Sequence, residues 1–346
     1  MSPQKQVSSR RRATKRDTAV KSAPQKSMGT KQKTVKSTEK SNTQAKDNSK
    51  KENAEPKKQY VETDETNSLI ERAVRVLSTG YPVHLTGKSG AGKTALAMEI
   101  AKRRERPVSV ITGNHEMSNE DLLGGITGLT STKLVDNFIS TVYKKEVNIK
   151  EDWTPGRLVE AAEKGHTLIY DEFSRSRPET NNLFLSILEE RVIPLYGTKQ
   201  KQSQVQVHPE FNIIFTSNPI EYAGIFEKQD ALMDRLITME VAFTQKTTEA
   251  IIQHTADIRH KDARYIWSIL KKLESEVGDA KELLSIRSAL MIATISKKAE
   301  IEIDKENNDF VQVCQDVLSG EVIRFEGADT FQRASHLVRS AVKDAD

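Results

Sequence analysis

The sequence predicts an α/β fold in which a domain built on a parallel sheet is followed by a smaller helical domain. A short apolar segment at 82–86 runs into a glycine-rich loop and then a helix. Two further apolar segments, at 166–173 and 211–219, end in acidic or polar residues, as buried parallel strands do when their ends carry a site. From about residue 244 onward, apolar residues recur at spacings of three and four, which is typical of helices. We therefore predict a basic arm at 1–60, a nucleotide-binding domain at 61–243 and a helical lid domain at 244–346.

The first 60 residues form a basic arm that we expect to be disordered. They carry 17 Lys and Arg against 5 Asp and Glu, a net charge of +12, and since the whole chain is +4 the rest is −8. Their few apolar residues have no helical or strand period, so burial cannot offset chain entropy. The arm is either a solubilising extension or an electrostatic tether for nucleic acid, a ribosome or an acidic protein surface. An Arg/Ser-rich start is also typical of transit peptides, but no amphipathic period supports that interpretation.

Composition indicates a cytoplasmic protein without a membrane span. Cys314 is the only cysteine, so no intrachain disulfide forms, and a reducing compartment is the simplest expectation. No run approaches the ~20 apolar residues that a transmembrane helix needs. His84 and His166 enter apolar segments, and we interpret them as strand residues and expect no transition metal.

A first helix is predicted from the segment ETNSLIERAVRVLSTG, residues 65–80. Its apolar residues fall on one face at helical spacing, beginning with Leu69 and ending with Leu77. Asn67 or Ser68 is expected to cap its start, and Gly80 to end it.

A phosphate-binding loop follows the first strand. The strand PVHLT, the loop GKSGAGKT and the helix TALAMEIAKRR come in the order that such a site requires. Glycines let the backbone N–H groups point at phosphate oxygens, and the helix adds its positive N-terminal end. Lys93 is expected to reach the β- and γ-phosphates of ATP, and Thr94 to offer its hydroxyl to Mg²⁺. The predicted nucleotide-binding residues of the loop are Gly87, Lys88, Ser89, Gly90, Ala91, Gly92, Lys93 and Thr94.

Two adjacent acids end the next buried strand, HTLIYDEF. Two like charges side by side are unfavourable unless one of the acids binds a cation or takes up a proton. We expect Asp171 to take the Mg²⁺ that Thr94 holds on its other side, and Glu172 to polarise the attacking water. An isolated acidic pair more often begins a solvated turn, but here a complete phosphate loop precedes it.

Three more candidates lie downstream of the acid pair. Asn218 ends the strand FNIIFTSNP and is expected to orient water near the γ-phosphate, although such a residue is often only a turn former. Arg235 follows a short helix, where it either stabilises phosphoryl charge in a neighbouring subunit or forms a surface ion pair with Asp234. Arg287 begins a helix of the second domain, as a contact of the lid to the nucleotide or as an ordinary surface residue.

The segment 192–211, VIPLYGTKQKQSQVQVHPEF, predicts a hairpin of two strands. Its Lys/Gln-rich tip, from Thr198 to Ser203, is either a contact for a client protein or a variable surface loop.

The order GKSGAGKT, LIYDEF, FTSNP, MDR and SIRSA resembles that of the AAA+ ATPases, and DEFSRSRP with VHPEFNIIFTSNP resembles their MoxR branch. Within that branch, EYAGIFEKQDALMDRLIT, GGITGL and TNNLFLSILEERVIPL are similar to the gas vesicle ATPases. The resemblance covers 66–243 well and the helical tail loosely. Lys88 and Ser89 stand where relatives often place a proline, and the basic arm is not part of the family pattern.

This resemblance implies an αβα sandwich around a parallel sheet of strand order 5-1-4-3-2, with a helical lid. It also implies that nucleotide binds between subunits of a ring, a hexamer. Asn218 would be sensor 1, Arg235 an arginine finger acting in trans, and Arg287 sensor 2. The expected partners are the chain itself and gas vesicle structural and accessory proteins.

The implied function is that of a Mg²⁺-dependent ATP hydrolase that remodels gas vesicle proteins during vesicle assembly and enlargement. Such a protein would be cytoplasmic and associated with gas vesicles. One alternative is a scaffold on the vesicle shell that needs ATP occupancy but not turnover. Another is an ATPase recruited to nucleic acid by the basic arm, although the acidic body with its two Trp shows no groove-reading element.

Overall fold

The computed structural model of the chain describes residues 60–135, 145–195, 203–218, 230–277, 285–326 and 331–345. The predicted basic arm lies outside the described residues, apart from its last residue, Tyr60.

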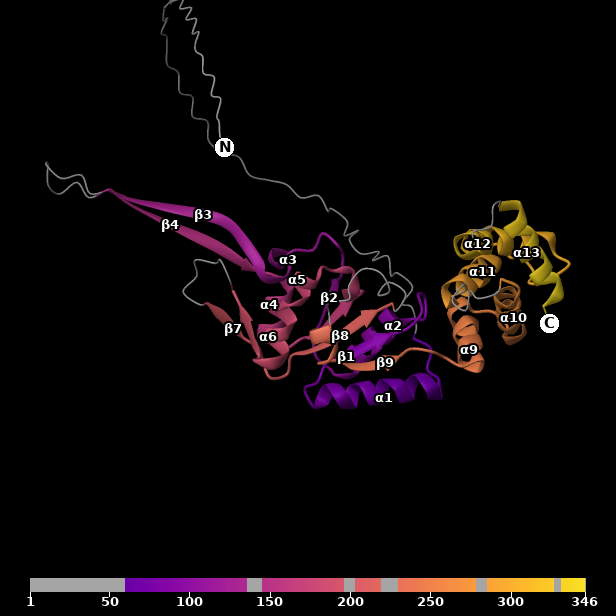
Figure 1. The fold of residues 1–346 in the computed structure, drawn as a ribbon, viewed down its shortest axis with the longest axis horizontal. Coiled ribbons are helices and arrows are strands. Elements are labelled where there is room, and N and C mark those ends of the chain that lie inside the picture. Colours follow the sequence, from indigo (N-terminus) through magenta and orange to yellow (C-terminus); the bar gives the residue numbers. More distant parts are fainter. Residues whose placement is uncertain are drawn as a thin grey trace, which may run out of the picture. The chain divides into compact units, whose positions relative to one another are not determined.

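A five-stranded parallel sheet forms the centre of the first domain (Figure 1). Its strands are β1 (Val83–Thr86), β2 (Val108–Thr112), β5 (Thr167–Asp171), β8 (Asn212–Ser217) and β9 (Ile237–Glu240). They lie in the order β2-β5-β8-β1-β9, and every neighbouring pair is parallel. Counted among themselves, the strands have the order 5-1-4-3-2 from the other edge, which confirms the predicted topology.

Helices cover both faces of this sheet, and the strands explain why. Successive side chains of a strand point to opposite faces. In β5, Leu168 and Tyr170 join one apolar cluster, whereas Ile169 between them joins the other. Ile214 of β8 likewise packs on the side of Ile169. Both faces are thus apolar, as an αβα sandwich requires.

The helices α1 (Asp64–Ser78) and α2 (Lys93–Arg103) pack on the face of Ile169. The opposite face carries α4 (Arg157–Lys164) and α6 (Leu183–Glu189). Shorter helices among the described residues of this domain are α3 (Asn119–Leu123), η1 (Phe173–Arg175), α5 (Pro178–Asn181) and α8 (Asp230–Met233).

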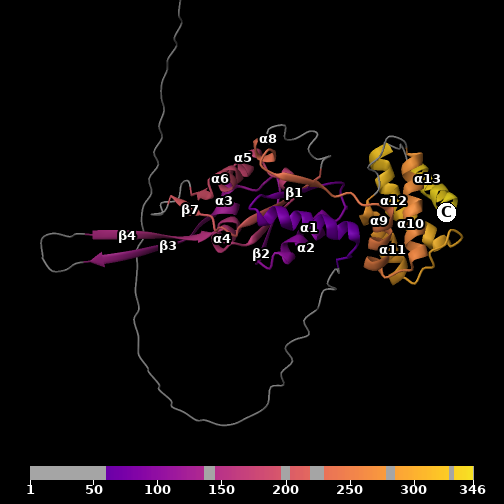
Figure 2. The same cartoon turned by 90° about the horizontal axis from the view of Figure 1, so that it is seen from below.

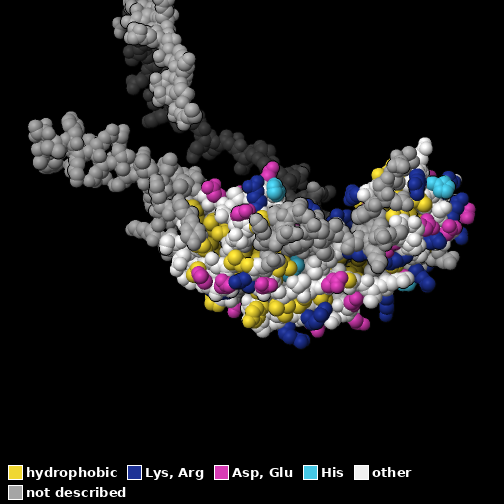
Figure 3. Space-filling model, viewed as in Figure 1, with side chains coloured by type: hydrophobic (Ala, Val, Ile, Leu, Met, Phe, Trp, Pro, Cys, Tyr) yellow, Lys and Arg dark blue, Asp and Glu magenta, His cyan; other side chains and the backbone are white. Residues whose placement is uncertain are grey.

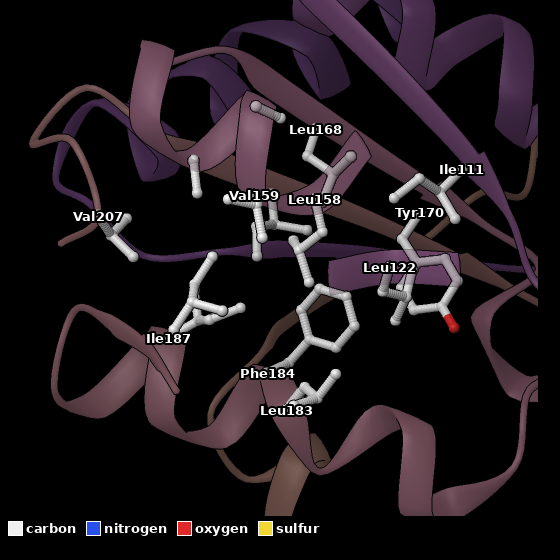
Figure 4. Packing of buried hydrophobic residues seen from close by; sticks show 14 of the residues in the cluster. Ile111, Leu122, Leu158, Val159, Leu168, Tyr170, Leu183, Phe184, Ile187 and Val207 are labelled. Atoms are coloured by element: carbon white, nitrogen blue, oxygen red, sulfur yellow. The ribbon is translucent and has the colours of Figure 1, made fainter. Parts of the chain in front are cut away.

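Most of the cluster under α4 and α6 is aliphatic, and the rings of Tyr170 and Phe184 pack within it (Figure 4). Tyr170 and Phe184 are fully buried, with ring centroids 5.1 Å apart. The Tyr170 hydroxyl lies 2.7 Å from Ser176 Oγ and 3.0 Å from Asn181 Oδ1, so its polar end is satisfied. Burial raises the pKa of Tyr170 to about 12.

Two antiparallel hairpins lie outside the central sheet, and Figure 2 shows the longer of them. The longer joins β3 (Gly124–Val135) to β4 (Lys145–Pro155), with a register shift between Ile126 and Gly128, and was not predicted from the sequence. The shorter joins β6 (Val192–Pro194) to β7 (Gln204–Gln206) and confirms the predicted hairpin. Of the predicted tip, Thr198 to Ser203, all but Ser203 lies outside the described residues.

The C-terminal region is helical and has an apolar core of its own. Its helices are α9 (Gln245–Ala256), α10 (His260–Glu276), α11 (Ile286–Lys298), α12 (Asn308–Glu326) and α13 (Phe331–Asp344). The buried residues of this core lie between Ile252 and Ala345 in the sequence. Phe243, just before the first of these helices, packs against the sheet cluster instead. Cys314 is fully buried in the helical core, and burial raises the pKa of its thiol.

The exact domain boundaries stay predictions. Within the described ranges, no helix is long and apolar enough to cross a membrane.

The start of α1 differs from the prediction. The helix begins at Asp64, and its N-cap is Thr63 instead of Asn67 or Ser68. Thr63 Oγ1 accepts from the Thr66 backbone at 3.2 Å, and Thr66 Oγ1 accepts from the Thr63 backbone at 2.9 Å. These two hydrogen bonds satisfy two backbone N–H groups that would otherwise be unpaired at the start of the helix. One turn farther along, the N–H groups bond to carbonyl groups of the helix itself, so no cap is needed there. The prediction placed the cap beside the first apolar residue and missed the turn before it.

Replacing Thr63 by Ala is expected to lower the free energy of unfolding by about 1 kcal/mol, because an N-cap hydrogen bond is lost. Replacing the exposed Ser68 by Ala should change it by less than about 0.5 kcal/mol. Denaturant unfolding of the two variants measures both values, and equal effects would contradict the assignment of the cap to Thr63.

Candidate nucleotide-binding and hydrolysis site

The phosphate loop, residues 87–92, joins β1 to α2. Gly90 and Gly92 have φ values of +75° and +86°, in the left-handed region that favours glycine. Gly92 is the N-cap of α2 and has no side chain to occupy the first-turn N–H groups. These donors, together with the positive end of the helix, are suited to bind a phosphate group.

Lys93 lies inside the loop and is 9% exposed. Its ammonium donates to the carbonyl oxygens of Gly87 at 2.7 Å and Lys88 at 2.8 Å. The positive charge is therefore held within the loop, where phosphate oxygens would meet it. The side chain of Lys88, by contrast, leaves the loop, and its ammonium lies 4.0 Å from a carboxylate oxygen of Glu274 in α10.

Two threonine hydroxyls converge on the carboxylate of Asp171. Thr94 Oγ1 donates to its two oxygens at 2.8 and 3.0 Å, and Thr216 Oγ1 lies 2.5 Å from one of them. Thr94 lies in the first turn of α2, Asp171 ends β5, and Thr216 is near the end of β8. Hydroxyl and carboxylate oxygens are hard ligands of the kind that Mg²⁺ prefers, and Mg²⁺ commonly binds through one or two such groups with phosphates and water completing its shell. The donor set fits that ion.

Glu172 turns away from Asp171 because its backbone leaves the strand. Its φ of 53° and ψ of 41° lie in the left-handed region, which is uncommon for a residue other than glycine. The Glu172 N–H donates to Thr216 Oγ1 at 2.9 Å, and its carboxylate pairs with Arg175 Nη1 at 2.9 Å. The two adjacent acids thus have different partners, hydroxyls for one and a guanidinium for the other.

Gly113, directly after β2, allows the backbone of this acid pair to come close. Its N–H donates to the Asp171 carbonyl at 2.7 Å. A Cβ at this position would lie 2.3 Å from the Glu172 carbonyl oxygen, closer than any real side chain comes. Any larger residue at position 113 would have to displace Glu172 or the end of β2.

The three remaining candidates occupy separate places. Asn218 follows β8 directly, at the same edge of the sheet as Asp171. Arg235 binds Glu189 of α6, at 2.7 Å through its Nε, so the ion pair anticipated with Asp234 has a different partner. Arg287 is exposed in the first turn of α11.

The loop and the start of α11 approach closely. A Cβ on Gly90 would lie 2.8 Å from the Cβ of Ser285 and 3.1 Å from the Cβ of Arg287. Arg287 therefore starts from a backbone next to the phosphate loop.

His84, predicted as a strand residue, is confirmed as part of β1, yet its surroundings are polar. The ring is 2% exposed, with Nε2 2.7 Å from Ser217 Oγ and Nδ1 3.0 Å from Thr238 Oγ1. Burial, and then the charge of Lys93, lower the pKa of His84 to about 4. The ring is therefore neutral at pH 7.

Sequence reasoning missed Thr216, Arg175, Gly113 and His84 as members of the site. A weak signal existed for one of them, because FTSN puts two hydroxyls at the end of an otherwise apolar strand. For the others, the contacts join segments that are far apart in the sequence, or depend on one backbone conformation.

The parallel sheet, the loop around Lys93 and the acid pair after β5 together define a P-loop nucleotide-binding domain. The family model of the AAA domain, dynein-related subfamily, matches residues 82–236. The chain is 38% identical over 279 residues to the gas vesicle ATPase GvpN of Ancylobacter aquaticus, covering 80% of this chain and 78% of that protein. It is 37% identical over 269 residues to GvpN1 of Halobacterium salinarum, covering 76% and 75%. The chain belongs to the gas vesicle ATPase family and is an AAA ATPase.

Among solved structures, a RuvB mutant of Thermotoga maritima is similar to 79% of this chain over 75% of its own length, with 18% identity and a TM-score of 0.46. At that score the similarity adds nothing to the topology described above.

Replacing Gly113 by Ala is expected to lower the ATPase kcat at least about tenfold, because the added methyl group displaces Glu172, and misplacement by about 1 Å has large effects on rate. The melting temperature should also fall, as overpacking costs roughly 1–3 kcal/mol. Gly125→Ala is the matched control, since a Cβ there would meet nothing within 4 Å. Equal rates in the two variants would contradict the prediction.

Acid is expected to destabilise the fold through His84. Its pKa is about 4 in the folded chain and 6.5 ordinarily, so the unfolded chain binds more protons between these values. Stability is then lost as the pH falls below 6.5, by about 2 kcal/mol at pH 5 from this residue. Denaturant unfolding at pH 7 and pH 5 measures the loss, which should be smaller by that amount in His84→Gln. The same loss in both proteins would show that another group is responsible.

Proposed function

We propose that this ATPase hydrolyses Mg²⁺-ATP in a ring and uses the cycle to remodel gas vesicle proteins as the vesicle shell assembles and enlarges. The observation that carries the proposal is the convergence of Thr94 and Thr216 on Asp171, beside a lysine buried in the phosphate loop. The family to which the chain belongs supplies the gas vesicle context.

We assign a role in hydrolysis to each side chain of the site, and the positions of the side chains support these assignments. Lys93 would bind the β- and γ-phosphates, while Thr94 and Asp171 would hold Mg²⁺. When bound, the ion would neutralise charge on the phosphate oxygens. Glu172 would accept a proton from the attacking water, and Asn218 would orient that water.

Glu172 is suited to this task by its separation from Asp171. Because Arg175 and the Thr216 hydroxyl hold Glu172 by different atoms, its carboxylate can exchange partners while the backbone stays in place. Its side chain is 39% exposed, so water reaches it.

We propose that the subunits form a ring, a hexamer, and that Arg235 has its role in this ring. In the single chain this guanidinium binds Glu189. We propose that in the ring it acts on the nucleotide of the neighbouring subunit, while Arg287 contacts nucleotide in its own subunit. The domains at 61–243 and 244–346 would then be the nucleotide-binding body and its lid.

The proposed clients are gas vesicle structural and accessory proteins, and the proposed location is the cytoplasm at the vesicle surface. Nucleic acid is a weaker candidate. On the face shown in Figure 3, acidic and basic side chains of the described residues are interspersed instead of forming a basic stripe. DNA binding by the full chain with a steep salt dependence would revive that alternative.

Cells whose only copy carries Glu172→Gln are expected to lack buoyancy and to contain small, stalled vesicles in electron micrographs, because hydrolysis is blocked while ATP binding remains. Glu179→Gln, the same change at an exposed residue of α5, is the control and should form normal vesicles. ATP hydrolysis by the purified proteins is measured alongside.

Lys93→Ala separates the two vesicle-related functions. If Glu172→Gln cells form normal vesicles and Lys93→Ala cells do not, the chain is an ATP-switched scaffold and turnover is not required. If both variants form normal vesicles, the proposed role in vesicle growth is wrong.

A further inference from the structure

We propose that His84 is a positioning residue for ATP hydrolysis, and that it acts by fixing Ser217 and thereby the adjacent Asn218. The inference rests on the role proposed above for Asn218 in orienting water. It adds a residue that neither the loop motif nor the acid pair includes.

One imidazole ring links three neighbouring strands. His84 lies in β1, between β8 and β9, and is in register with Phe215 on one side and Thr238 on the other. Its Nδ1 is 3.0 Å from the hydroxyl of Thr238, directly opposite. Its Nε2 reaches diagonally to Ser217 Oγ, two residues farther along β8, at 2.7 Å. The ring therefore leans toward the edge of the sheet where the site lies.

Packing alone does not account for a histidine here. The ring is 2% exposed and Ser217 is fully buried, so each polar atom loses its hydration and must be paired. An aliphatic side chain would fill a strand interior at a lower cost. What the histidine adds is two hydrogen bonds in fixed directions, and these constrain the end of β8. Because Ser217 is bonded directly to Asn218, that constraint passes to the backbone of Asn218.

The same ring also contacts the neighbour of Glu172. Its edge meets the ring of Phe173, with centroids 5.4 Å apart and planes at 90°. Phe173 in turn packs edge-on against Phe215 at 5.2 Å. His84 thus touches the residues adjacent to both groups that we assign to the attacking water. The phosphate contacts come from the loop and α2, so loss of His84 should change turnover more than ATP binding.

Ser217→Ala is the first test. It should lower kcat about tenfold and leave the KM for ATP within about twofold, because the water-orienting group is misplaced and the phosphate contacts remain. Thr180→Val is the matched control, since it removes another buried hydroxyl, bonded to the Met117 carbonyl at 3.0 Å, from the same domain. An equal change of kcat in both variants would overturn the proposal.

His84 itself is tested by two substitutions and a double variant. His84→Phe removes both hydrogen bonds and should reproduce the loss of kcat, and combined with Ser217→Ala the loss should stay near tenfold instead of multiplying. His84→Gln can still reach Ser217 and should retain kcat within about threefold. A multiplied loss, or a loss in His84→Gln as large as in His84→Phe, would contradict the link. If His84→Phe fails to fold, the comparison of Ser217→Ala with Thr180→Val still decides.

Asn218→Ala distinguishes failure of this inference from failure of the proposed function. If Asn218→Ala lowers kcat and Ser217→Ala does not, only the role of His84 is wrong. If Asn218→Ala leaves kcat unchanged, the proposed role of Asn218 fails, and the inference fails with it.

Discussion

The carboxylate of Asp171 is the contact on which the geometry of the site depends. Asp171 ends the strand β5, and the helix α2 and the strand β8 bring Thr94 and Thr216 to it through hydrogen bonds of 2.5 to 3.0 Å. Charge-assisted hydrogen bonds of this kind are shorter and stronger than neutral ones. Because the segments come from three different parts of the chain, the contact forms only when the sheet has its native strand order.

Close backbone approach is the second constraint, and it explains the strained conformation of Glu172. The left-handed backbone at Glu172 costs of order 1–3 kcal/mol and persists only where neighbours hold it. Here Thr216 accepts its N–H, and Gly113 allows the end of β2 to lie against it. The turn directs two consecutive acids to different partners. The same neighbours that hold the strain also place the carboxylates.

Three apolar clusters stabilise the described part of the chain, two on the faces of the sheet and one among the C-terminal helices. The sheet clusters hold the strand ends at which the site is built, whereas the helical cluster around Cys314 is separate from them. The two regions come close where Gly90 of the loop lies beside Ser285 and Arg287 at the start of α11. Gly90 therefore contributes in two ways: its backbone adopts the left-handed conformation of the phosphate loop, and its missing side chain leaves space for the start of α11.

Much of this architecture could be predicted from the sequence, because its signals are local. The loop around Lys93, the apolar strand before Asp171 and the hairpin after Val192 each depend on residues that are adjacent along the chain. The strand order came from resemblance to a family, and the sheet confirms it. The predicted cap of α1 was wrong by one turn. The N-cap is Thr63, because its side chain bonds to Thr66, whereas the prediction placed the cap next to the first apolar residue.

By itself, the sequence determined the phosphate loop, the acid pair and the class of fold, because each depends on the order and spacing of neighbouring residues. Only the tertiary structure decided that Thr216 binds Asp171, that Arg235 pairs with Glu189 and that His84 reaches Ser217. These contacts join residues 45, 46 and 133 positions apart. The contacts of Thr216 and His84 depend on how strands line up within the sheet, and the contact of Arg235 depends on how α6 packs against α8. No local pattern of residues specifies either arrangement.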